Sequence, residues 1–169
     1  VFRLQAQHQA AVFELGMNHP GEIAILSAIA QANVALVNNA QREHQEFMQT
    51  VEAVAIENGA VIQSLPADGV AVFPADDTYT AIWKEFAGQR KTLTFGLVSH
   101  SAQKADQKAD VLGSFVAQDF GSDIQMSIQG EAVTVQLAAA GQHNVLNALA
   151  AAACCSAIGI STAKIVEGL

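Results

Sequence analysis

Two side chains in the first quarter of the sequence have the chemistry to bind a divalent cation. Glu14 lies near the end of the apolar run Ala10–Leu15, which we predict to be a buried parallel strand. A carboxylate there is costly unless it is paired or binds a cation, and open parallel sheets bind ligands at this edge. His44 follows a second short strand, so its loop should emerge at the same edge. Spacing alone leaves a metal ligand and a loop cap equally open for Glu14, and a lone loop histidine is more often a surface residue.

Two carboxamides open a helix late in the sequence. Asn144 and Asn147 are three residues apart and therefore share one face of its first turn. A carboxamide can bond an adenine through N6 and N7. Taken by itself, Asn144 is better explained as a helix cap.

Other patterns exclude several classes of protein. No glycine precedes a lysine and no Gly-x-Gly occurs, so the sequence contains neither a P-loop nor a dinucleotide fingerprint. A net charge of −8 argues against a nucleic-acid binder, and the apolar runs are too short to span a membrane. The adjacent Cys154 and Cys155 read as buried free thiols, which suits the cytoplasm.

Alternating strands and helices must position these groups. After the strand Ala10–Leu15, we predict a mostly parallel sheet flanked by helices, which makes this one α/β domain. The helix after position 50 should begin at the N-cap Thr50 and stop at Pro66. The further strands expected are Val34–Val37, Gly69–Phe73 and Lys91–Val98, and the helices are Gly21–Gln31, 51–65 and Tyr79–Ala87.

The second half of the sequence has a different pattern. Alternation of apolar and polar residues predicts a small antiparallel section, with a turn at Gln129 and Gly130. We expect a polar loop over 99–108 and a closing helix capped by Ser161. The strands expected are Asp110–Phe120, Ile124–Ile128 and Val133–Leu137, and the helices are His143–Ile158, ended by Gly159, and Thr162–Leu169.

Three segments in this order resemble the Mur ligases of peptidoglycan synthesis. They are Glu14–Ile23 (ELGMNHPGEI), Val37–His44 (VNNAQREH) and Gly141–Ala152 (GQHNVLNALAAA). The first is the most specific, and it is similar to the member that adds D-alanyl-D-alanine. The resemblance covers essentially all 169 residues.

The resemblance implies the central ATPase domain of a three-domain ligase, with a P-loop NTPase-like fold. The P-loop segment would precede residue 1 and the C-terminal ligase domain would follow residue 169, so the chain alone should be inactive. The substrates implied are ATP, UDP-N-acetylmuramoyl-tripeptide and D-alanyl-D-alanine, with Mg²⁺ as cofactor. ATP would phosphorylate the tripeptide carboxylate, and the amine of D-alanyl-D-alanine would attack the acyl phosphate. We expect a monomer.

By position, the resemblance assigns roles to six residues. Glu14 and His44 match the family's Mg²⁺ ligands, and Asn144 and Asn147 match the residues that hold adenine. Asn18 and His19 fall in the motif loop at the same edge and are candidates for contact with the substrate.

One position departs from the family pattern. Where these ligases commonly carry a carbamylated lysine, the alignment places Asn58, which cannot be carbamylated. Either a second Mg²⁺ is held differently, with help from Glu57, or this branch manages without that group. Two alternatives to the ligase stay open: a relative such as folylpolyglutamate synthetase, and a non-catalytic nucleotide-binding module.

Overall fold

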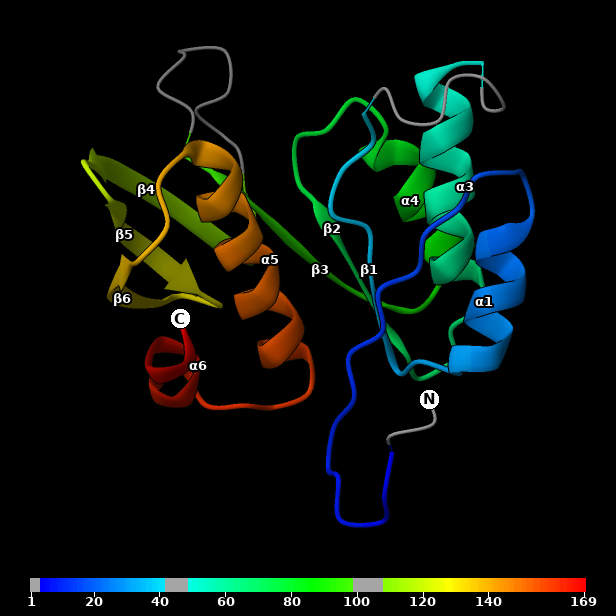
Figure 1. Cartoon of the computed structure of the whole chain (residues 1–169), viewed down its shortest axis with the longest axis horizontal. Helices are drawn as coiled ribbons and strands as arrows, with labels where there is room; N and C mark the ends of the chain where they lie inside the picture. The colour runs from blue at the N-terminus through cyan, green and yellow to red at the C-terminus, as the bar shows by residue number, and fades with distance from the viewer. Residues whose placement is uncertain (1–3, 42–48, 99–107) are drawn as a thin grey trace.

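The computed structural model describes residues 4–41, 49–98 and 108–169, and these ranges form a six-stranded sheet between two layers of helices (Figure 1). The strand order is β1-β2-β3-β4-β5-β6. Strands β1 to β4 are parallel, whereas β5 and β6 continue the sheet as antiparallel hairpins. The strands are β1 (Val34–Leu36), β2 (Val70–Pro74), β3 (Lys91–Leu97), β4 (Val111–Gln118), β5 (Gly121–Ile128) and β6 (Glu131–Leu137).

The helices divide between the two faces of the sheet according to the alternation of side chains along each strand. On β2, Val70 and Val72 pack in the core that contains α5 and α6, whereas Ala71 and Phe73 pack against α3 and α4. Because both faces of β2 are covered, its sequence is continuously apolar. The helices are α1 (Glu22–Ala30), α3 (Val51–Gln63), α4 (Thr80–Ala87), α5 (Gln142–Ala157) and α6 (Thr162–Gly168).

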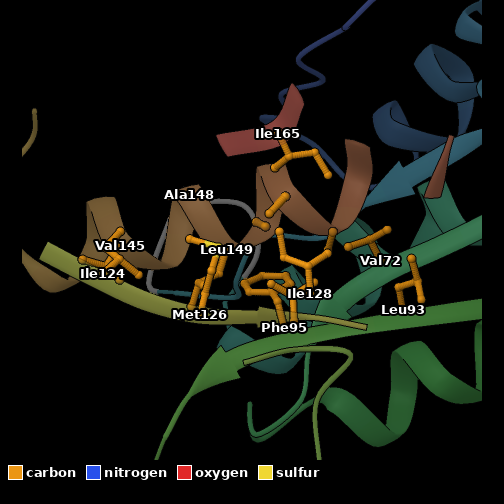
Figure 2. Close-up of a cluster of buried hydrophobic side chains, with 14 of the residues drawn as sticks. Val72, Leu93, Phe95, Ile124, Met126, Ile128, Val145, Ala148, Leu149 and Ile165 are labelled. Carbon is orange, nitrogen blue, oxygen red and sulfur yellow. The ribbon is translucent and has the colours of Figure 1, made fainter. Parts of the chain in front are cut away.

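Helix α5 packs across strands β2 to β5 (Figure 2). Its buried face is rich in alanine, which lets the helix backbone come close to the sheet. Gly113 on β4 serves the same contact, because a Cβ there would lie 2.8 Å from Cδ2 of the buried Leu149. The side chains labelled in this core include Val72, Leu93, Phe95, Ile124, Met126, Ile128, Val145, Ala148, Leu149 and Ile165.

Helices α3 and α4 pack closely on the opposite face. The indole N–H of the buried Trp83 donates to the carbonyl of Ala55 at 2.9 Å. Gly59 gives room for the ring of Phe86, because a Cβ there would lie 2.7 Å from Phe86 Cδ2. The guanidinium of Arg90 donates to the carbonyl of Leu65 at 2.8 Å and so binds the C-terminal end of α3.

Most of the expected elements are confirmed. The strands expected from residues 34, 69 and 91 and the helices expected from residues 21, 51, 79 and 143 agree with the structure within two residues at each end. Thr50 is the N-cap of α3, since its hydroxyl accepts the N–H of Ala53 at 3.1 Å. Gln129 and Gly130 both have positive φ, 48° and 93°, as the tight turn between β5 and β6 requires.

The strand predicted over Ala10–Leu15 is wrong. The segment has no regular structure, and the side chain of Val12 is 97% exposed. An apolar run becomes a buried strand only when a neighbouring strand satisfies its backbone, and no described strand pairs with this segment. The expected Asp110–Phe120 strand is also not purely antiparallel, because β4 pairs in parallel with β3.

One further expectation is met only in part, and another falls mostly outside the described residues. Ser161 occupies the N-cap position of α6, but its side chain makes no capping hydrogen bond. Most of the polar loop expected over 99–108 lies outside the described residues, as do residues 42–48 with His44.

Candidate functional site

The carboxyl end of β1 and the N-terminus of α5 meet, although they are 109 positions apart. Asn38, two residues beyond β1, donates from its side-chain Nδ2 to Oδ1 of Asn147 at 2.8 Å. The N-termini of α1, α3 and α5 lie at this same end of the sheet (Figure 1). Helix N-termini favour negative charge. The Glu57 carboxylate already supplies it at α1 and the Thr50 hydroxyl caps α3, whereas α5 has no side-chain cap hydrogen bond, so the N-terminus of α5 is the one of the three that suits an anionic or polar ligand.

Asn144 and Asn147 occupy one face of the first turns of α5. The Nδ2 of Asn144 donates to the carbonyl of Ala140 at 2.8 Å. The alternative that Asn144 caps the helix is wrong, because the N-cap position belongs to Gly141, with φ of 98°. Asn144 is half-buried and Asn147 is exposed, so a ligand at this edge can reach both carboxamides.

The loop before α1 is shaped by Glu22. Its carboxylate accepts the backbone N–H of Asn18 at 2.6 Å and that of His19 at 3.1 Å, and it lies 3.3 Å from the His19 ring nitrogen Nδ1. The hydrogen bonds from Asn18 and then His19 lower the pKa of Glu22 below its ordinary value. Asn18 and His19 are both exposed.

Glu57 has a different role from the one suggested by the sequence. Its carboxylate is buried, with 9% of the residue exposed, and accepts the N–H of Gly21 and that of Ile23 at 2.9 and 3.0 Å. These are amides at the start of α1, so Glu57 binds a helix N-terminus. The hydrogen bonds of Glu57 give it a structural role at the start of α1, and its help in holding a second Mg²⁺ stays a prediction.

Asn58, next to Glu57 on α3, makes a contact with a different part of the chain. Its Nδ2 donates to the backbone carbonyl of Asn39 at 3.3 Å, just after β1. Asn58, which stands where the resemblance led us to expect a lysine, thus contacts the chain segment that leads toward His44.

The structure does not test whether Glu14 and His44 bind a metal together, because it describes only Glu14. Glu14 is exposed in an irregular segment, so it does not end a buried strand as predicted. His44 lies outside the described residues. Within residues 4–41, 49–98 and 108–169, no group of three or more His, Cys, Asp or Glu side chains could hold a metal ion.

Sequence reasoning missed the role of Asn38. Asn38 lies in the segment Val37–His44, and the sequence alone indicates no contact for it. The available signal was its place directly after a buried parallel strand, where side chains reach the ligand edge of an open sheet. Its partner on α5 could not be read from the sequence.

The fold defines an open α/β domain with carboxamides and helix N-termini gathered at the carboxyl end of a parallel sheet, which is the edge where such sheets bind ligands. Residues 1–155 match the Mur ligase middle domain, and the chain belongs to this family. None of the helices in the described part of the chain is long and apolar enough to cross a membrane.

Curated relatives match the chain over its whole length. It is 33% identical over 169 residues to the UDP-N-acetylmuramoyl-tripeptide–D-alanyl-D-alanine ligase of Escherichia coli, covering 100% of this chain and 36% of that protein. The ligase of the same name from Haemophilus influenzae is 31% identical, with 100% and 35% covered. The chain therefore spans about a third of the length of the relatives that it matches.

Solved structures of related ligases have the same fold as this chain. A crystal structure of MurF from Acinetobacter baumannii superposes with a TM-score of 0.89 and 32% identity, covering 98% of this chain and 35% of that one. MurF from Thermotoga maritima, solved in complex with ADP, has a TM-score of 0.73, with 90% of this chain and 34% of that chain covered. At 23% identity, that likeness shows the shared fold alone.

Proposed function

We propose that this chain is the central ATP-binding domain of a ligase that joins D-alanyl-D-alanine to UDP-N-acetylmuramoyl-tripeptide in the cytoplasm. The observation that carries the proposal is the Asn38–Asn147 hydrogen bond, which brings the second and third family segments together at one sheet edge. The similarity of the whole of this chain to about a third of ligases of this name supports it. In the proposed protein, a P-loop precedes residue 1 and a ligase domain follows residue 169.

The proposed reaction has two steps. The tripeptide carboxylate attacks the γ-phosphorus of ATP, which forms an acyl phosphate and releases ADP. The amine of D-alanyl-D-alanine then attacks the acyl carbon, and phosphate leaves as the amide forms. Both steps bring negatively charged or polar reactants together, so their main requirement is positioning and charge screening.

In this proposal, the described residues bind and orient the nucleotide. The first turn of α5 holds the adenine through Asn144 and Asn147, and the loop with Asn18 and His19 faces the substrate. Glu14 and His44 would hold Mg²⁺; the exposed Glu14 carboxylate is an oxygen donor of the kind that this ion prefers. Bound Mg²⁺ screens the repulsion between carboxylate and phosphates.

A coupled assay on the full-length protein encoded by the gene tests the proposal. Phosphate release from ATP should require both UDP-N-acetylmuramoyl-tripeptide and D-alanyl-D-alanine. Turnover with folate and glutamate instead would favour a folylpolyglutamate synthetase-like enzyme. Nucleotide binding without turnover on either substrate set would favour a non-catalytic module.

A further inference from the structure

A carboxamide recognises a base only if its correct end faces that base. Its oxygen accepts hydrogen bonds and its nitrogen donates them, although the two ends have nearly the same size. Adenine presents a donor at N6 beside an acceptor at N7, whereas guanine presents two acceptors, O6 and N7. The orientation of each amide on α5 therefore decides which base edge fits.

The backbone fixes the orientation of Asn144. Its side-chain Nδ2 donates to the carbonyl oxygen of Ala140 at 2.8 Å. A carbonyl oxygen can only accept, so the nitrogen end must point toward Ala140. The oxygen end remains as an acceptor, which suits the N6–H of adenine and opposes O6 of guanine.

Asn38 is the hydrogen-bond partner of the second amide. Its Nδ2 donates to Oδ1 of Asn147 at 2.8 Å, so the oxygen end of Asn147 points toward β1. The nitrogen end of Asn147 is then the end that can donate to a ligand. One acceptor and one donor thus lie on the same helix face, which matches the N6 and N7 pair of adenine.

We propose that Asn38 is a positioning residue for base recognition, which holds the Asn147 carboxamide so that its Nδ2 donates to adenine N7. The inference rests on the proposed function, in which the first turn of α5 binds the adenine of ATP. Asn38 acts through Asn147 and touches no reacting atom.

The substitution Asn38→Asp tests this directly. A carboxylate cannot donate, so Asp at position 38 would accept from Asn147 Nδ2 and turn the Asn147 oxygen toward the base. The probe is 7-deaza-ATP, in which a C–H replaces N7 while the triphosphate is unchanged. Comparing the two nucleotides cancels any effect of the added charge on the phosphates.

The measurement is the KM of the full-length protein for ATP and for 7-deaza-ATP. In the wild type, we expect the KM for 7-deaza-ATP to exceed that for ATP roughly tenfold, because one donor is left without its acceptor. In Asn38→Asp, the ratio of the two KM values should fall to about one, with kcat for ATP changed by less than about twofold. Asn38→Ala should also lower the ratio of the KM for 7-deaza-ATP to the KM for ATP.

Asn33→Asp is the matched control. Asn33 is exposed just before β1, so this substitution adds the same charge at the opposite end of the same strand, and the KM ratio should stay at the wild-type value. A wild-type ratio in both Asn38 variants would overturn the inference. So would a wild-type enzyme that uses ATP without discriminating against 7-deaza-ATP. A full-length protein that does not use ATP at all would instead overturn the proposed function.

Discussion

Glu57 on α3 binds the backbone N–H of Gly21 with both carboxylate oxygens, each at 2.9 Å. One of these oxygens also accepts the N–H of Ile23 at 3.0 Å. A carboxylate at this place satisfies amides that have no partner within α1, and it complements the positive end of the helix dipole. The contact holds α1, and with it the preceding motif loop, against α3.

Removing this carboxylate should loosen α1. We expect Glu57→Ala to destabilise the domain by about 1.5–3 kcal/mol, because buried amides lose a charged acceptor. Hydrogen exchange of the full-length protein, followed by mass spectrometry, should show reduced protection in residues 22–30. Glu85→Ala, at an exposed glutamate on α4, is the control and should change stability by less than about 0.5 kcal/mol. Unchanged protection of α1 in Glu57→Ala would contradict this role.

Gly113 should tolerate no side chain while Leu149 is present. An added Cβ would lie 2.8 Å from Leu149 Cδ2 in a fully buried contact, so we expect Gly113→Ala to destabilise by about 1–3 kcal/mol in urea denaturation. The double variant Gly113→Ala/Leu149→Val should lose less than the sum of the single variants. Gly168→Ala is the control, since a Cβ there meets no atom within 4 Å. Additive losses would show that the two residues do not share this contact.

The thiol of Cys154 should be unreactive near neutral pH. Burial raises its pKa to about 11 from an ordinary value of 9.0, and the neighbouring Cys155 adds to the rise. The folded state therefore favours the neutral thiol, and this contribution is complete below pH 9.0 and lost as the pH rises toward about 11. Because the thiolate is the reactive form, iodoacetamide at about pH 8 should label Cys154 more slowly in the native protein than after unfolding in urea. Equal labelling rates, resolved by peptide mass spectrometry, would argue against the burial.

Glu14→Ala should lower kcat of the full-length ligase by about tenfold or more, because the proposed Mg²⁺ ligand screens charge in the reacting complex. Its thermal stability should stay near the wild-type value, since the Glu14 side chain is exposed. His44→Ala should behave in the same way. Near wild-type turnover of Glu14→Ala over a range of Mg²⁺ concentrations would remove Glu14 from the proposed metal site.

Asn147→Ala should mainly raise the KM for ATP, roughly tenfold, with a smaller change in kcat. The physical reason is that a contact to the adenine is equally strong in the ground state and the transition state. The measurement is steady-state kinetics at saturating concentrations of the other two substrates. A loss confined to kcat would place Asn147 near the reacting atoms instead of the base.

Local patterns predicted most of the fold because their causes are local. Thr50 caps α3 through its own hydroxyl, and the apolar run that forms β2 is long enough to require burial on both faces. The run Ala10–Leu15 is also mostly apolar, yet it forms no strand, because a strand also needs partners for its backbone. That requirement is not visible in the segment itself.

The sequence by itself determined the α/β class, the succession of its elements and the three segments that mark the family. Those features follow from side-chain periodicity and short motifs, which act within a few residues. Only the tertiary structure decided that Glu57 binds the start of α1, that Gly141 is the N-cap of α5, and that Asn38 contacts Asn147. The carboxamides of Asn38 and Asn147 meet because a strand and a helix that are far apart in the sequence pack together. The spacing of residues within a short segment contains no information about such a long-range contact.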